Sequence, residues 1–183
     1  IVEGVSQASP GNIYVFRVQV RDAEGNLTDW SDEGKVILAP PSRVLEVPYP
    51  YTSIQAAIHE ANHGDTIVIH PGTYAGGDNS NLNFGGKAIT IRSEDPENPQ
   101  IVASTIIDCG GTQDAGNDHG PRRAFLFENG EGRDSVIDGL TIINGYAVNN
   151  PRFTEPGGEN GLDAFGGGIL CTNGSSPTVS NLV

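Results

Sequence analysis

The sequence is poor in several residue types that mark particular classes of protein. Its 183 residues include no methionine, one tryptophan and two cysteines, and ten lysine and arginine residues stand against 23 aspartate and glutamate residues, for a net charge of −13. The few basic residues are scattered, so we expect no nucleic-acid partner. No apolar run reaches the length of a membrane span. The 25 glycines follow no Gly-X-Y period, which excludes collagen.

The two ends of the sequence are the next feature. The first residue is Ile1, no signal-peptide pattern follows it, and Val183 stands within a strand-like segment. We therefore expect a piece of a longer chain.

The most informative stretch is 52–74. Four apolar residues recur there at i, i+3, i+4 and i+7, which predicts a short amphipathic helix: Ile54, Ala57, Ile58 and Ala61. Thr52 and Gln55 have the spacing of a capping box. The β-branched run 66–70 predicts a strand, and Pro71 with the glycine after it predicts a turn.

Beyond residue 76 the pattern is one of short strands separated by Gly, Asn, Asp and Pro, with no second long helical period. The predicted strands are 89–91, 101–102, 104–108, 124–127, 135–139, 140–143, 168–171 and 177–183.

Five phrases in this part of the chain resemble the opening coils of right-handed parallel β-helix proteins of the pectate-lyase-like superfamily, over residues 44–183: HGDTIVIHPGTY, GKAITIRSED, STIIDCGG, VIDGLTIINGYA and GGGILCTNGSSPTVSNLV. The resemblance implies an all-β fold, a right-handed parallel β-helix (solenoid) whose equivalent strands stack into parallel sheets. It also implies that 52–62 is an N-terminal amphipathic capping helix, which would protect unpaired strand edges. The polar loops 110–123 and 145–167 interrupt the repeat.

Residues 1–38 have a different sequence pattern from the rest of the chain. Apolar residues alternate from Tyr14 to Val20, which predicts an antiparallel strand, and 35–38 is its expected partner. The phrase PGNIYVFRVQVRDAEGNLTDWSD resembles the last two strands of a fibronectin type III domain. The expected organisation is a fibronectin III-like β-hairpin at 1–38, a linker at 39–45, and the cap and first coils of an incomplete β-helix at 46–183.

The candidate catalytic residues are Arg92, Asp108 and Asp138. In pectate-lyase-like enzymes, as the resemblance implies, acidic side chains hold calcium and a basic residue removes a proton. Their hydrolase relatives use grouped aspartates. Arg92, close to Asp95 and Glu97, fits such a cluster, although a solvated corner is the favoured interpretation. Asp108 and Asp138 occur in the similar phrases IIDC and VIDG, so they could occupy equivalent corners of nearby coils, as a glycosidase pair would. Aspartates before tight turns more often cap backbone N–H groups.

Metal sites have several candidates. Two glycine-rich loops carry oxygen ligands that suit calcium, or that equally belong to an acidic surface: Asp114, Asn117 and Asp118 in one, and Glu159, Asn160 and Asp163 in the other. The phrase HEANH matches the H-E-x-x-H pattern, with His59 and His63 as zinc ligands, but the capping role of the helix weighs against it. His70 and His119 are interpreted as structural or exposed.

Cys109 and Cys171 have two interpretations. Each follows a predicted strand, so each could be a small buried apolar residue, or the pair could form a disulfide that suits a secreted protein.

Two functions from different classes fit these features. The favoured hypothesis is a structural or binding module of a large secreted or cell-surface protein, which presents loops on a β-helix for contact with carbohydrate or a surface, or for self-assembly through the open solenoid end. The alternative is a polysaccharide lyase or glycoside hydrolase whose active groove lies on later coils. Calcium is the cofactor to consider, and the expected location is extracellular or at the cell surface.

Overall fold

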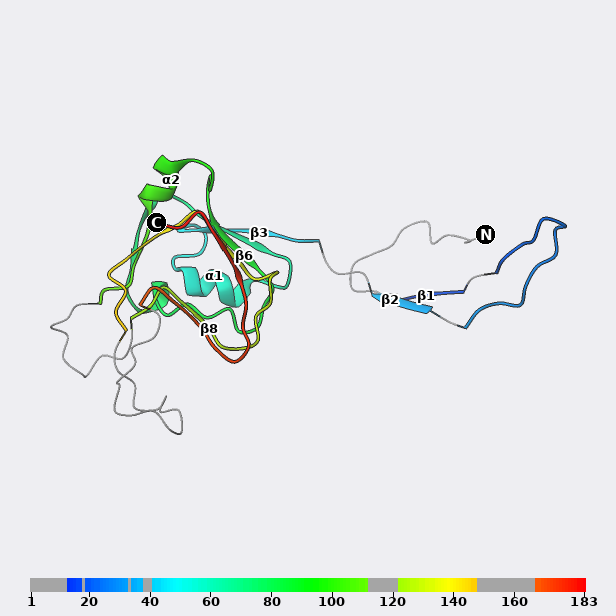
Figure 1. Cartoon of the computed structure of the whole chain (residues 1–183). Coiled ribbons are helices and arrows are strands. Elements are labelled where there is room, and N and C mark those ends of the chain that lie inside the picture. Colours follow the sequence, from blue (N-terminus) through cyan, green and yellow to red (C-terminus); the bar gives the residue numbers. More distant parts are fainter. Residues whose placement is uncertain (1–12, 18, 33, 38–40, 112–121, 148–166) are drawn as a thin grey trace, which may run out of the picture. The chain divides into compact units, whose positions relative to one another are not determined.

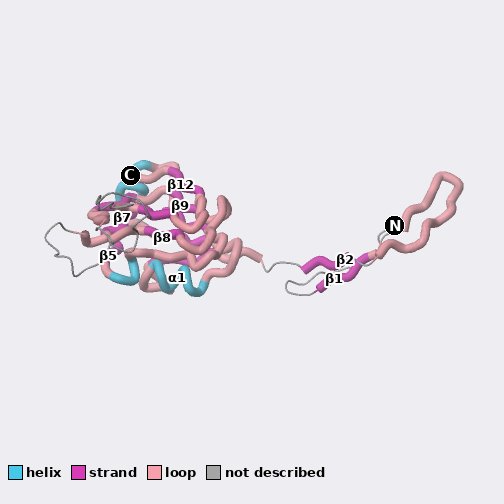
Figure 2. Tube along the Cα trace, turned by 60° about the horizontal axis from the view of Figure 1, so that its bottom comes forward, coloured by secondary structure: helices cyan, strands magenta, loops and turns pink. Residues whose placement is uncertain are grey.

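The computed structural model describes residues 13–17, 19–32, 34–37, 41–111, 122–147 and 167–183. The chain divides into two compact units, Ile1–Pro41 and Ser42–Val183. Each unit has its own strands, drawn in Figures 1 and 2.

The first unit contains an antiparallel hairpin. Strand β1 (Ile13–Phe16) pairs with β2 (Gly34–Ile37), and Phe16 lies opposite Gly34. At the tip, Asp22 accepts a hydrogen bond of 2.7 Å from the backbone N–H of Asn26, as turn aspartates commonly do. The antiparallel pairing is confirmed, but β1 ends at Phe16 rather than at Val20.

The second unit is built from parallel strands in three sheets. The first sheet has five strands, in the order β3 (Val44–Val47), β4 (Thr66–Ile69), β6 (Thr90–Ser93), β9 (Val136–Asp138) and β12 (Thr178–Ser180). The second sheet has the order β5 (Gly72–Ala75), β7 (Thr105–Asp108) and β10 (Thr141–Ile143). The third pairs β8 (Phe125–Phe127) with β11 (Ile169–Cys171). This unit is therefore β-rich, with parallel strands, as expected.

The chain visits these sheets in a repeating order. It passes from β4 to β5, then through Leu82, which forms a parallel bridge with Phe125 of the third sheet, and returns to the first sheet as β6. The same order follows in β6, β7 and β8, and again in β9, β10 and β11 before β12. Each new strand thus lies beside the strand placed one circuit earlier (Figure 2).

The in-register pairing aligns apolar side chains into columns. Leu45, Ile67, Ile91 and Ile137 are register partners on successive strands, and all four are buried. The third sheet contributes an aromatic cluster in which the ring centroid of Phe84 lies 4.9 Å from that of Phe127. Burying one such side chain contributes about 1.5–3 kcal/mol.

Helix α1 (Ile54–Glu60) lies across one end of this unit, the end at which β3 forms the sheet edge (Figures 1 and 2). The predicted apolar face of the helix is buried. The predicted capping box is wrong, because Ser53 is the N-cap and its side chain accepts a hydrogen bond from the N–H of Ala56. Gln55 instead exchanges two hydrogen bonds with the backbone of Asn83.

Two short helical segments lie between strands. Residues 101–102, predicted as a strand, belong to helix α2 (Pro99–Ser104), because Asn98 caps the N-terminus and proline occupies its first turn. The 3-10 helix η1 (Gly77–Asn79) lies beside α1, where Asn79 accepts a hydrogen bond from the N–H of Ile54. Strand β3 begins at Val44, inside the range 39–45 predicted as a linker.

Candidate functional site

Polar side chains gather where four strands of the first sheet end. Arg92 near the end of β6 is the register partner of Asp138 on β9, which in turn lies opposite Ser180 on β12. Parallel strands end at the same edge of a sheet, so the residues that follow them also meet there: His70 after β4, Glu94 after β6 and Asn181 after β12. We call these six residues the sheet-end cluster.

Arg92 and Asp138, two of the three predicted catalytic residues, are thus brought together. Each makes its hydrogen bonds elsewhere. The Arg92 guanidinium donates to the carbonyl oxygens of Ser93 and Glu94, both at 2.9 Å. The Asp138 carboxylate accepts from the Ser180 hydroxyl at 2.8 Å and from the Asn181 amide at 2.9 Å. Arg92 therefore holds the backbone that follows β6 in place. Asp138 instead joins β9 to β12 and the residue after it, through their side chains, so its bonds are not those of a turn cap.

The other members of the cluster form looser contacts. His70 Nδ1 lies 3.3 Å from Glu94 Oε2, and both side chains are substantially exposed. An exposed pair of this kind contributes at most about 1 kcal/mol. The Asn181 amide also donates to Glu97 Oε1 at 3.4 Å. The cluster therefore offers solvent a guanidinium, an imidazole, an amide and carboxylates, which are groups that can hydrogen-bond hydroxyl-rich ligands.

Asp108, the third candidate, lies in a different sheet. It ends β7 and pairs in register with Ile143 and Ala75. Its Oδ1 accepts hydrogen bonds from the N–H of Gly110 at 2.9 Å and from the Asn144 amide at 2.8 Å. The expectation that Asp108 and Asp138 occupy equivalent corners is wrong, because IIDC ends a strand of the second sheet and VIDG a strand of the first.

The zinc hypothesis fails on the geometry of the helix. Because α1 ends at Glu60 and Ala61 is extended, His59 and His63 do not share a helical face. His63 Nδ1 accepts a hydrogen bond from the N–H of Ala88 at 3.1 Å. Lys87 donates to the carbonyl oxygens of Ile58 and His59 at the C-terminal end of the helix.

The calcium candidates Asp114, Asp118, Glu159 and Asp163 lie outside the described residues, as does His119. Within the described ranges, no group of three or more His, Cys, Asp or Glu side chains could hold a metal ion.

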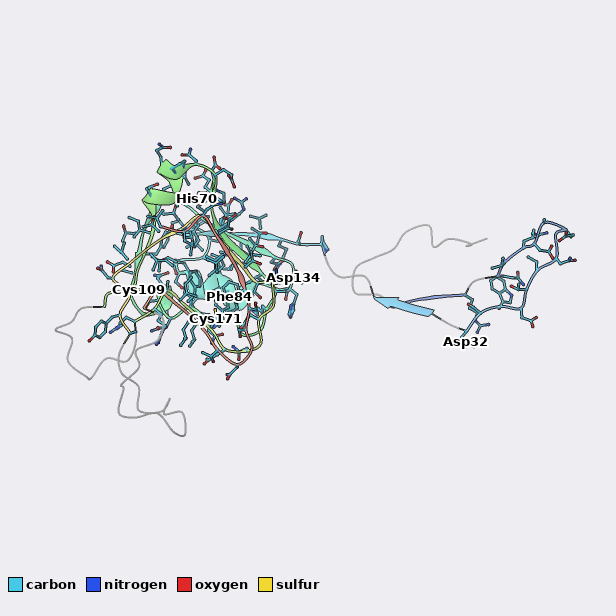
Figure 3. The ribbon with its side chains drawn as sticks, in the orientation of Figure 1. Asp32, His70, Phe84, Cys109, Asp134 and Cys171 are labelled. Atoms are coloured by element: carbon cyan, nitrogen blue, oxygen red, sulfur yellow. The ribbon has the colours of Figure 1, made fainter. Side chains whose placement is uncertain are left out.

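The two cysteines are free thiols in the structure. Cys109 follows β7 of the second sheet and is buried, whereas Cys171 ends β11 of the third sheet and is exposed. Figure 3 labels both, together with His70 of the sheet-end cluster, which lies away from them. The structure thus contains no bond between Cys109 and Cys171.

Sequence reasoning missed two buried carboxylates that join neighbouring circuits of the chain. Asp65 accepts four hydrogen bonds, three from Arg43 and one from the N–H of Asn62, with an Arg43 Nη2 to Asp65 Oδ2 distance of 2.7 Å. Burial alone would raise the pKa of Asp65, but these hydrogen bonds lower it below its usual value. The glycine before Asp65 suggests a turn, and no signal suggests an arginine partner 22 residues away.

Glu131 has the same role in the middle of the unit. It is buried, and it accepts from the backbone N–H groups of Gly86 and Asn129, at 3.0 and 2.9 Å, and from the Ser175 hydroxyl at 2.8 Å. Burial works to raise the pKa of Glu131, and the hydrogen bonds lower it further than burial raises it. These partners come from three circuits, so Glu131 ties the corners of those circuits together.

No family model, curated protein or solved structure matches the chain. Within the described residues, no helix has the length and apolar character needed to cross a membrane.

Proposed function

We propose that the second unit comprises the N-terminal cap and first coils of a right-handed parallel β-helix, and that it serves as a structural or binding module of a large secreted or cell-surface protein. The observation that carries the proposal is the repeated order in which the chain visits three parallel sheets, with each strand in register with its predecessor. A repeat of this kind needs neighbours to bury its apolar face. Helix α1 then acts as the cover of the first coil.

The first unit is proposed to be the C-terminal hairpin of a fibronectin type III-like domain. The antiparallel register of β1 and β2 supports this assignment, together with the turn at Asp22. A two-stranded hairpin is marginal in isolation, so the remaining strands of such a domain would come from other parts of the protein.

Carbohydrate is the proposed ligand class of the β-helix, and the outward face of the first sheet is its contact surface. One row of register partners on this face presents three polar residues at the spacing of neighbouring strands, about 4.8 Å: Arg92, Asp138 and Ser180. Glu46 belongs to the same row but is separated from them by the buried Val68. The adjoining row carries β-branched residues, Thr66, Thr90, Val136 and Thr178. Regularly spaced donors and acceptors on a rigid face suit an extended polymer of hydroxyl-rich units.

The alternative function, a polysaccharide lyase or glycoside hydrolase, is favoured by one observation, the adjacency of Arg92 and Asp138. The hydrogen bonds of both side chains weigh against it. Arg92 is held by two backbone carbonyls and Asp138 by Ser180 and Asn181, so neither is poised for proton transfer. Binding is therefore the stronger proposal.

Affinity electrophoresis through gels that contain single acidic or neutral polysaccharides tests the proposal. We expect at least one polysaccharide to retard the chain and Arg92→Gln to weaken that retardation several-fold. Arg21→Gln, which removes the same charge from an exposed residue of the first unit, is the matched control and should bind as the parent does.

Two results would contradict the proposal. Failure of every polysaccharide to retard the chain would remove the carbohydrate contact. Release of unsaturated products or new reducing ends by the parent, lost in Asp138→Asn, would favour the enzymatic alternative.

A further inference from the structure

The turn that follows β3 carries the most exposed aromatic side chain that the structure describes in the second unit. Tyr49 is 82% exposed, and it stands between Pro48 and Pro50, which are exposed as well. The other three tyrosines of this unit are buried or partly buried: Tyr51, Tyr74 and Tyr146. Segment 48–50 therefore presents an apolar surface with an aromatic ring at its centre.

This turn is fixed on both sides. Before it, Val47 ends β3 with a fully buried side chain, and its carbonyl oxygen accepts a hydrogen bond of 3.0 Å from the N–H of His70. The buried Tyr74 hydroxyl lies 3.3 Å from that carbonyl oxygen and 2.9 Å from the carbonyl oxygen of His70. After the turn, Tyr51 packs against the core. Prolines restrict φ on either side of Tyr49, so its backbone loses little conformational entropy when a ligand binds.

Tyr49 extends the sheet-end cluster by one circuit. It follows β3 by two residues, whereas His70 and Glu94 directly follow β4 and β6, and these three strands are neighbours in register. Neighbouring strands lie about 4.8 Å apart, so the three strand ends span about 10 Å. The side chains of His70 and Glu94 are 36% and 53% exposed. An aromatic ring and two hydrogen-bonding side chains therefore adjoin at one exposed corner, all within the described residues.

The charge of this corner favours a neutral ligand. Three carboxylates lie in or beside the sheet-end cluster, those of Glu94, Glu97 and Asp138. The cluster has one guanidinium, that of Arg92, and it already donates to two backbone carbonyls. The whole chain also has a net charge of −13. A sugar that carries carboxylate or sulfate groups would therefore be repelled.

We propose that Tyr49 is the stacking platform of the carbohydrate site and that this site takes a neutral polymer of pyranose sugars. The inference rests on the carbohydrate function proposed above and deepens it. The C–H groups on one face of a pyranose ring can pack on the face of an aromatic ring, which leaves the hydroxyl groups at the rim free to form hydrogen bonds. The imidazole of His70 and the carboxylate of Glu94 supply a donor and acceptors for those hydroxyls.

Affinity electrophoresis tests the inference with pairs of polymers that share a backbone. Each pair consists of a neutral polymer and a carboxymethylated one: hydroxyethyl cellulose with carboxymethyl cellulose, and galactomannan with carboxymethyl galactomannan. We expect at least one neutral polymer to retard the chain more strongly than its carboxymethylated counterpart, at low and at high salt. Tyr49→Ala should weaken this retardation by about tenfold or more. Tyr49→Phe should change it by less than about twofold, because the ring and not the hydroxyl makes the contact.

Val44→Ala is the matched control, because it truncates an exposed apolar side chain at the other end of β3. It should bind as the parent does, and the variants should keep the thermal midpoint of the parent. Loss of binding together with a lower midpoint in Tyr49→Ala would overturn the inference, because the ring would then be a structural residue.

Three further results would also overturn it. These are parental binding by Tyr49→Ala, equal weakening by Tyr49→Phe, and retardation by the carboxymethylated polymers alone. Each of them includes a polymer that retards the chain, so each leaves the carbohydrate function standing. A chain that no polymer retards would remove both that function and the role of Tyr49.

Discussion

The two edge strands of the first sheet, β3 and β12, differ in how far their core-facing side chains are shielded from solvent. At the β3 end, Leu45 is 3% exposed because α1 lies over the core, and Arg43 and Asp65 fasten the edge strand to the next circuit. At the β12 end, Val179 holds the equivalent position and is 44% exposed. The equivalent positions on β3 and β12 therefore differ in exposure, and at the β3 end the cause is the covering helix.

The difference shows that edge strands are not interchangeable in a stacked sheet. A helix that supplies three buried apolar side chains satisfies the first end from within the same chain. Matched substitutions at the two ends test this contrast, from the largest expected effect to the smallest.

Weakening the packing of helix α1 should have the largest effect on the free energy of unfolding. Ile58→Ala deletes a fully buried side chain of α1 and should lower the free energy of unfolding by about 3 kcal/mol, through lost burial and the cavity left behind. Val179→Ala, the matched truncation at the open end, should cost less than about 1 kcal/mol because Val179 is already partly hydrated. Urea denaturation measures both losses. Equal losses would remove the distinction between the two ends.

Removing the buried carboxylate at the covered end should come next. Asp65→Asn removes the negative charge of the carboxylate that accepts hydrogen bonds from Arg43 and from the N–H of Asn62. We expect the free energy of unfolding to fall by about 2 kcal/mol. Asp138→Asn is the control near the open end, because its carboxylate is partly exposed and accepts from two side chains. It should cost under about 1 kcal/mol. Thermal unfolding with matched buffers measures both, and a larger loss in Asp138→Asn would contradict the comparison.

The pH dependence of stability should follow from the same buried carboxylates. The folded-state pKa values of Asp65 and Glu131 are lowered, so the unfolded state binds more protons than the folded state as the solution is acidified. Their contribution is therefore present above about pH 4 and is lost as the pH falls through the folded pKa values. Asp65→Asn combined with Glu131→Gln should flatten the acid limb of a stability-against-pH curve. An unchanged limb would show that other groups control acid unfolding.

The two cysteines should differ in their reactivity toward a thiol reagent, with little effect on stability. Burial raises the pKa of the Cys109 thiol to about 11, with a further contribution from the charge of Asp108. Burial and the charge of Glu131 also raise the pKa of Cys171, but its side chain is exposed at the end of β11. We expect a maleimide to label Cys171 and to spare Cys109 in the folded chain, as mass spectrometry of peptides would detect. Failure of both to react even after denaturation without reductant would instead identify the disulfide.

Periodicity in the sequence predicts the elements that bury a regular pattern. The spacing of Ile54, Ala57, Ile58 and Ala61 specifies the buried face of α1, and the alternation around Ile89 and Ile91 indicates β6. The start of α1 is harder to predict, because Thr52 and Ser53 are both able to cap a helix and the backbone decides between them. In α2, Ile101 and Val102 favour a strand, but Asn98 caps a helix and the proline after it occupies the first helical turn, so the segment is helical.

Contacts between circuits were beyond the reach of the sequence. Which strands become neighbours depends on the length of each connecting loop, so local phrases cannot reveal that Arg92 lies beside Asp138. Asp108 and Asp138 each accept a hydrogen bond from an asparagine amide far along the chain, Asn144 and Asn181, but the similar phrases around them end strands of different sheets. The partners of Asp65 and Glu131 are distant in sequence for the same reason.

The register of the first sheet is the central claim, and amide-to-amide nuclear Overhauser effects measure it most directly. In a spectrum of the chain with assigned backbone resonances, we predict interstrand contacts that link β4 to β6 and β6 to β9, with Ile67, Ile91 and Ile137 aligned. Antiparallel contacts, or parallel contacts shifted from this alignment, would contradict the stacked circuits and every inference drawn from them.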